Sequence, residues 1–76
     1  IIESASGIDQ LVKTYNFSNY TESLDFSNKV ANLAESEDHH PKIVLEYGSV
    51  EISWWSHKIK GLHKNDFICA AKTDLI

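Results

Sequence analysis

The chain has 76 residues, of which 42% are hydrophobic and 24% are charged, and its net charge is -4. This length allows a single domain over residues 1–76, and the hydrophobic fraction is far above that of disordered chains. The negative charge argues against direct nucleic-acid binding, and no apolar run approaches the ~20 residues that a membrane span needs.

The first half of the chain predicts a strand hairpin followed by a long helix. Two extended segments, residues 1–5 and about 10–17, are joined by a turn at Ser6-Gly7. Ser18 or Asn19 is a good N-cap for a helix that continues to about Glu37. The expected buried face of this helix follows three- and four-residue spacings: Tyr20, Leu24, Phe26, Ser27, Val30, Ala31 and Ala34.

The second half predicts another hairpin and a second helix. Pro41 prevents the first helix from continuing, so residues 38–41 form a junction. Alternating side chains then indicate two strands, residues 43–47 and 50–54, with a two-residue turn at Gly48-Ser49. From about His63 to the C-terminus, apolar residues recur at helical spacing: Phe67, Ala70, Ala71 and Leu75.

These elements predict an α+β fold. The simplest arrangement that buries each apolar stripe has two layers, a four-stranded, mainly antiparallel sheet with both helices packed on one face. Because so small a core gives marginal stability, we also expect self-association. The lone Cys69, expected in the core, suits a reducing compartment, so we expect a cytoplasmic protein. Since the sequence does not begin with Met, some native N-terminal residues are expected to be missing from it.

Three of the four histidines are expected to lie close together. His39 and His40 are at the junction after the first helix, and His57 ends the last strand. A hairpin that turns at Gly48-Ser49 places Pro41 opposite Ser56, which brings His57 beside His39 and His40. The sequence therefore predicts one pocket that holds three imidazoles.

Two carboxylates, Glu35 and Asp38, are expected near the same place. Imidazoles beside carboxylates suit proton transfer near neutral pH. Two other interpretations stay open. A His-His pair at a helix end can be a solvated surface feature, and three histidines with a carboxylate can bind zinc. Adjacent histidines diverge, however, and the sequence has no spaced ligand pair, so we expect no metal.

The run Glu35-x-x-Asp38-His39-His40-Pro41, followed by Tyr47, Ser56-His57 and Gly61-Leu62-x-x-x-Asp66, resembles the pterin-4a-carbinolamine dehydratase family. The resemblance covers nearly the whole chain. It implies an enzyme that removes water from 4a-hydroxytetrahydrobiopterin to give quinonoid dihydropterin, and so recycles the cofactor of aromatic amino acid hydroxylases. It also implies a homodimer or homotetramer that needs neither a metal nor a cofactor.

The resemblance also implies roles for individual residues. The expected catalytic residues are His39, His40 and His57. The residues expected to bind the pterin substrate are Glu35, Asp38 and Pro41, together with Trp55, which departs from the family's pattern. A functional link to an aromatic amino acid hydroxylase is expected as well.

Three positions depart from the family's pattern. Ile2 stands where the family usually has Trp, and Trp55 replaces a small polar residue, so that it could narrow the pocket or stack on the pterin. His63 stands where Thr or Ser usually caps the last helix. Because His is a poorer cap, Asp66 is expected to act mainly through its favourable interaction with the helix dipole. Because some relatives are dimerisation or assembly partners, the alternative function is a non-catalytic interaction module.

Overall fold

The structure is a computed structural model that describes residues 2–5, 8–56, 59 and 61–76. Its elements are, in chain order, β1 (Ile2–Ala5), β2 (Ile8–Asn16), α1 (Tyr20–Glu37), β3 (Lys42–Glu46), β4 (Ser49–Trp54) and α2 (Lys64–Asp74). Asn19 caps α1 by accepting a hydrogen bond from the backbone N–H of Glu22, and the helix ends at Glu37 as predicted. The α+β fold class predicted from the sequence is therefore confirmed.

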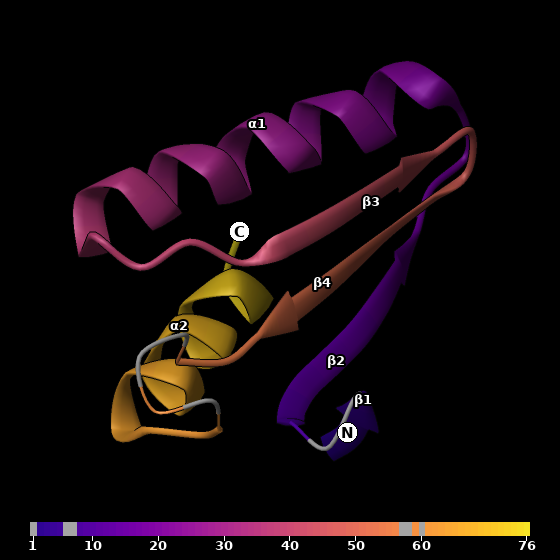
Figure 1. Cartoon of the computed structure of the whole chain (residues 1–76). Helices are drawn as coiled ribbons and strands as arrows, with labels where there is room; N and C mark the ends of the chain where they lie inside the picture. Colours follow the sequence, from indigo (N-terminus) through magenta and orange to yellow (C-terminus); the bar gives the residue numbers. More distant parts are fainter. Residues whose placement is uncertain (1, 6–7, 57–58, 60) are drawn as a thin grey trace.

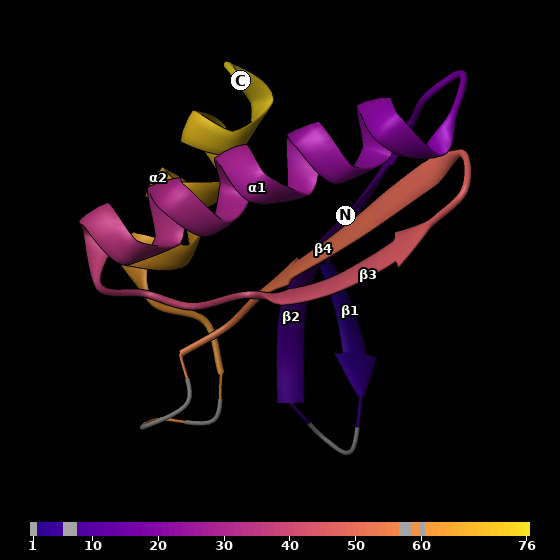
Figure 2. The same ribbon diagram turned by 90° about the horizontal axis from the view of Figure 1, so that it is seen from above.

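The described strands pair antiparallel in the order β1-β2-β4-β3. Both helices lie on the same face of this sheet (Figure 1), and Figure 2 shows the two layers from above. α1 contacts β3 and β4, while α2 contacts β2 and β4. Within the described part of the chain, no helix is both long enough and apolar enough to span a membrane.

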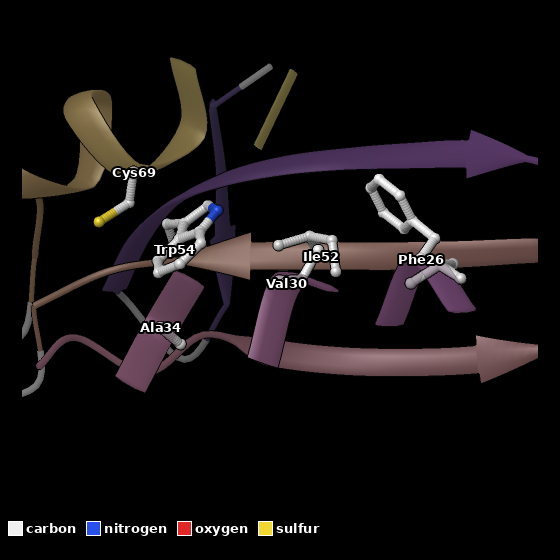
Figure 3. Close-up of a cluster of buried hydrophobic side chains, with 7 residues drawn as sticks. Phe26, Val30, Ala34, Ile52, Trp54 and Cys69 are labelled. Atoms are coloured by element: carbon white, nitrogen blue, oxygen red, sulfur yellow. The ribbon is translucent and has the colours of Figure 1, made fainter. Parts of the chain in front are cut away.

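The core lies where alternate side chains of β4 meet the two helices (Figure 3). Since successive side chains of a strand point to opposite faces, one set from β4 is buried beneath the helices. The buried hydrophobic residues are Val50, Ile52 and Trp54 from β4, Phe26, Val30 and Ala34 from α1, and Cys69 from α2. Trp54, at the end of β4, lies where the sheet meets α2 and so connects the core to the loop that follows.

The β3–β4 hairpin turns one residue earlier than predicted. Glu46 pairs with Ser49, so the turn residues are Tyr47 and Gly48, and the prediction of Gly48-Ser49 is wrong. The backbone N–H of Phe17 donates to the Gly48 carbonyl at 2.8 Å and holds the turn against the end of β2. The pairing shifts by two residues, which preserves the face on which each β4 side chain lies.

The predicted buried face of α1 is only partly correct. Phe26, Val30 and Ala34 are buried, but Tyr20, Leu24 and Ala31 are exposed. Two serines on the same face are also buried, the predicted Ser27 and Ser23, which was not predicted. Each can be buried because its hydroxyl donates to a backbone carbonyl one turn earlier. A serine satisfied in this way packs as a small residue.

The predicted face of α2 is wrong for most of its residues. Phe67, Ala71 and Leu75 are exposed, and Ala70 is half-buried. The buried side chains of this helix are instead Asp66, Cys69 and Thr73. Thr73 satisfies its hydroxyl by donating to the Cys69 carbonyl at 2.8 Å. A hydrophobicity pattern overlooks this stripe because two of its three members are polar.

We expect the end of α2 to make stability depend on pH. The side chains of Lys13 and Tyr15 donate to Asp74 Oδ1 at 2.8 Å and 2.6 Å, and these hydrogen bonds hold the Asp74 pKa below its ordinary 3.8. A lowered folded-state pKa contributes stability above the unfolded value, and this is lost as the pH falls through the folded value. Because the side chains of the Lys13–Asp74 ion pair are about half-exposed, we expect the pair to contribute only about 0.2–1 kcal/mol to the free energy of unfolding.

Urea unfolding of the wild type and of Asp74→Asn would measure this effect. The difference in the free energy of unfolding should be constant above about pH 5 and shrink towards zero in stronger acid. Asp25→Asn, which removes an exposed carboxylate from α1, is the control. A difference that grows on acidification would contradict the expectation.

Candidate functional site

The site is built around Asp66, a fully buried carboxylate in the first turn of α2. Its Oδ1 lies 2.5 Å from His39 Nε2. Its Oδ2 accepts hydrogen bonds from the Ser56 hydroxyl at 2.9 Å and from the His63 backbone N–H at 2.8 Å. Since a buried carboxylate is costly unless it is paired and hydrogen-bonded, these partners account for its presence in the core.

His39 is directed towards Asp66 by the way in which α1 ends. Asp38 adopts the left-handed conformation, with φ 50° and ψ 42°, and the backbone N–H of His39 donates to the Ala34 carbonyl at 3.1 Å. Left-handed residues of this kind commonly terminate helices. The chain therefore turns back towards the sheet directly after α1, and the His39 side chain is only 15% exposed.

The His39 ring has two defined contacts. Because a carboxylate only accepts hydrogen bonds, Nε2 donates to Asp66. The ring also stacks on the Trp54 indole, with centroids 5.7 Å apart and planes 15° from parallel. Nδ1 has no hydrogen-bond partner among the residues that the structure describes. In this tautomer, Nδ1 is the nitrogen that can take a proton from a bound molecule.

His40 lies apart from this buried arrangement. Its side chain is 57% exposed, and Nε2 lies 2.8 Å from Glu35 Oε1. The two adjacent histidines thus have different carboxylate partners, one buried and one at the surface. Asp38 is exposed, and the other two predicted substrate-binding residues, Pro41 and Trp55, are half-buried.

The remaining predicted catalytic residue, His57, lies outside the described residues. The pairing used to place it beside His39 is wrong, because Lys42 pairs with Ser53 and Ser56 forms an isolated bridge with Gly61. The physical reason is the earlier turn at Tyr47-Gly48. That His57 belongs to the same pocket stays a prediction from the resemblance.

The sequence prediction did not include Asp66, Ser56 or Trp54 among the site residues. Asp66 was expected to serve mainly the helix dipole, but its carboxylate bonds to His39 and Ser56 as well as to the helix start. His63 does cap α2, since its Nδ1 accepts from the Asn65 N–H at 3.3 Å. The spacing of His63 and Asp66 is that of a capping box, which indicates that Asp66 bonds back to the helix start but does not indicate that it is buried.

Cys69 takes no part in this arrangement. As predicted, it is a buried core residue, and its thiol is free. Burial, followed by the nearby Glu37 carboxylate, raises the pKa of the thiol. Among residues 2–5, 8–56, 59 and 61–76, no group of three or more His, Cys, Asp or Glu side chains could hold a metal ion.

Comparison with known families and proteins identifies relatives of the chain. The model of the family described as pterin 4 alpha carbinolamine dehydratase matches residues 4–76. A curated protein of Saccharophagus degradans that carries the name of a pterin-4-alpha-carbinolamine dehydratase is 63% identical over 73 residues, which are 96% of this chain and 65% of that protein. Its counterpart in Vibrio vulnificus is 64% identical over 70 residues, 92% of this chain and 64% of that protein. The chain therefore spans slightly less than two thirds of the length of these relatives.

Solved structures that share the fold include the following two. The crystal structure of a transcriptional coactivator/pterin dehydratase from Brucella melitensis has a TM-score of 0.85 and 23% identity, and the match covers 97% of this chain and 79% of that one. A pterin dehydratase-like protein identified as a RuBisCO assembly factor in the alpha-carboxysome has a TM-score of 0.81 and 21% identity, with 99% and 84% covered. At these identities, the two structures support the fold alone.

Proposed function

Because this chain belongs to the pterin-4-alpha-carbinolamine dehydratase family, we propose that it converts 4a-hydroxytetrahydrobiopterin to quinonoid dihydropterin and water. The observation that carries this proposal is the His39–Asp66 pair, in which a buried carboxylate holds one ring nitrogen while the other has no hydrogen-bond partner among the residues that the structure describes. The reaction regenerates a pterin for re-reduction, so the proposal includes a functional link to an aromatic amino acid hydroxylase.

The proposed reaction requires two proton transfers. The bond between C4a and the hydroxyl oxygen breaks, both electrons leave with oxygen, and an acid supplies the proton that completes the water molecule. A base removes the proton from N5, and the electron pair of that N–H bond forms the C4a=N5 double bond. Positioned imidazoles can do both at neutral pH, and help of this kind is typically worth ~10²- to 10⁴-fold.

The described contacts suggest different roles for the neighbouring histidines. We assign one proton transfer to His39, through Nδ1, and the other to His57. His40, exposed and paired with Glu35, would orient the pterin. The remaining substrate contacts are assigned to Asp38, Pro41 and Trp55.

A stopped-flow assay with chemically generated 4a-hydroxytetrahydropterin tests the proposal. We expect the wild type to accelerate dehydration above the spontaneous rate. The control variant Asp25→Asn, which changes an exposed residue of α1, should have the same rate as the wild type. A wild-type rate equal to the spontaneous rate would overturn the dehydratase function. It would favour the alternative of a non-catalytic dimerisation or assembly module.

Dehydratase activity is expected to be independent of metal. The proposed cleavage of the C4a–O bond needs only an acid and a base, and His39 and His40 have separate carboxylate partners, which is poor geometry for shared metal ligation. Incubation with a strong chelator, followed by its removal, should leave kcat unchanged. A loss of activity that added zinc restores would favour a metal site instead.

We also propose that residues 1–76 form a single domain that assembles as a homodimer or homotetramer in the cytoplasm. Among the described strands, β3 lies at an edge of the sheet, and an unpaired edge can be covered by a symmetric partner. The free, buried thiol of Cys69 suits a reducing compartment. Sedimentation at micromolar concentration should give a mass above 8.6 kDa, and a clean monomer would contradict the assembly.

A further inference from the structure

We infer that Trp54 is a positioning residue, which fixes the plane of the His39 imidazole for proton exchange. This inference rests on the proposed dehydratase function. The stacked geometry supports it, since the two ring centroids are 5.7 Å apart and the planes differ by 15°. Trp54 is 2% exposed and lies at the end of β4, so its own position is fixed by the sheet and the core.

The two contacts of His39 restrict different motions. The hydrogen bond from Nε2 to Asp66 restrains one corner of the ring, but the ring can still tilt by rotation about the bond that joins it to Cβ. The indole face of Trp54 opposes that rotation, because turning the imidazole out of the parallel plane would drive its edge into the indole. Together, Asp66 and Trp54 determine where Nδ1 points.

The choice of tryptophan is otherwise unfavourable at this position. Its indole Nε1 is buried and has no hydrogen-bond partner among the described residues. A buried donor without an acceptor costs free energy, and buried tryptophans usually have a partner. An aliphatic residue would avoid that cost, as Val50 and Ile52 do on the same face of β4. What the tryptophan adds is a flat aromatic surface, and His39 lies on that surface.

Two substitutions of Trp54 distinguish the effect of its aromatic face on His39 from the effect of the volume that it fills in the core. Trp54→Phe keeps an aromatic ring, whereas Trp54→Leu keeps an apolar side chain without a face. Val30→Ala, which removes volume elsewhere in the same core, is the matched control for loosened packing. Each variant would be assayed at a temperature where circular dichroism shows it to be folded.

NMR reports on the contact without any reference to activity. In the wild type, we expect nuclear Overhauser contacts between the indole of Trp54 and the carbon-bound ring protons of His39, with the latter shielded by the indole ring current. His39→Gln assigns these protons by removing them. Shielding should persist in part in Trp54→Phe and disappear in Trp54→Leu, while Val30→Ala leaves it unchanged. If Trp54→Leu does not fold, the wild-type contacts and the Phe variant still test the inference.

Kinetics test the consequence for catalysis. Because small misplacement of a reacting group can cost up to ~100-fold, we expect Trp54→Leu to lower kcat about 10- to 100-fold with KM within about twofold. Trp54→Phe should recover kcat to within about threefold of the wild type. An active wild type together with an unchanged kcat in Trp54→Leu would overturn the positioning role alone, as would equal losses in the Phe and Leu variants. An inactive wild type would overturn the proposed function first and the positioning role with it.

Discussion

Replacing Asp66 with alanine should destabilise the folded chain by about 3–5 kcal/mol, since removing one member of a buried charged network leaves its partners without compensation. The substitution would leave three donors unpaired, from His39, Ser56 and the backbone of His63. Domains are stabilised by about 0.05–0.15 kcal/mol per residue, roughly 4–11 kcal/mol for 76 residues. We therefore expect Asp66→Ala to be largely unfolded or close to it.

Urea unfolding followed by circular dichroism measures this loss. Asp66→Asn keeps the shape and one acceptor oxygen, so it should lose less stability than Asp66→Ala. Ser56→Ala removes a single hydrogen bond to a charged group, worth about 1.5–3 kcal/mol, and serves as the matched smaller change. If Asp66→Ala cost no more than an exposed change such as Asp25→Asn, the buried network would not stabilise the fold.

The order of strands and helices could be predicted from the sequence because local signals indicate it directly. The alternation of side chains in β4 predicted that Val50, Ile52 and Trp54 share one face. This prediction holds although the register differs by two residues, because side chains of a strand repeat their direction every two residues. The exact turn was not predictable from the strand pattern. The contact that holds it, from Phe17 to Gly48, joins segments far apart in the chain.

The candidate site was predicted less completely than the fold. The motif identified His39 and Glu35, but it did not indicate that His40 takes Glu35 as its partner while His39 turns inward to Asp66. That division depends on the left-handed conformation of Asp38, which nothing in the hydrophobic pattern reports. The burial of Asp66 likewise depends on donors from three separate segments. Sequence spacing can suggest such a network, but only the fold brings its members together.

The largest kinetic effect is expected when His39 and His57 are both changed. If one imidazole protonates the leaving hydroxyl and the other takes the proton from N5, each single change removes one transfer. We use His39→Gln because its amide can still donate to Asp66, which limits the loss of stability. His57→Gln is its counterpart. Each single variant should lower kcat about 10- to 100-fold, and the double variant should approach the spontaneous rate.

The adjacent His40 provides the control for this assignment. Its ring is exposed and paired with Glu35, so His40→Gln should raise KM more than it lowers kcat. Stopped-flow measurements on the four variants, each shown by urea unfolding to be folded, compare these effects directly. A double variant as fast as either single variant would show that the two histidines do not divide acid and base duty. A wild-type rate in every variant would assign the reaction to other groups, and the buried His39–Asp66 pair would then be a structural feature of the junction between α1 and α2.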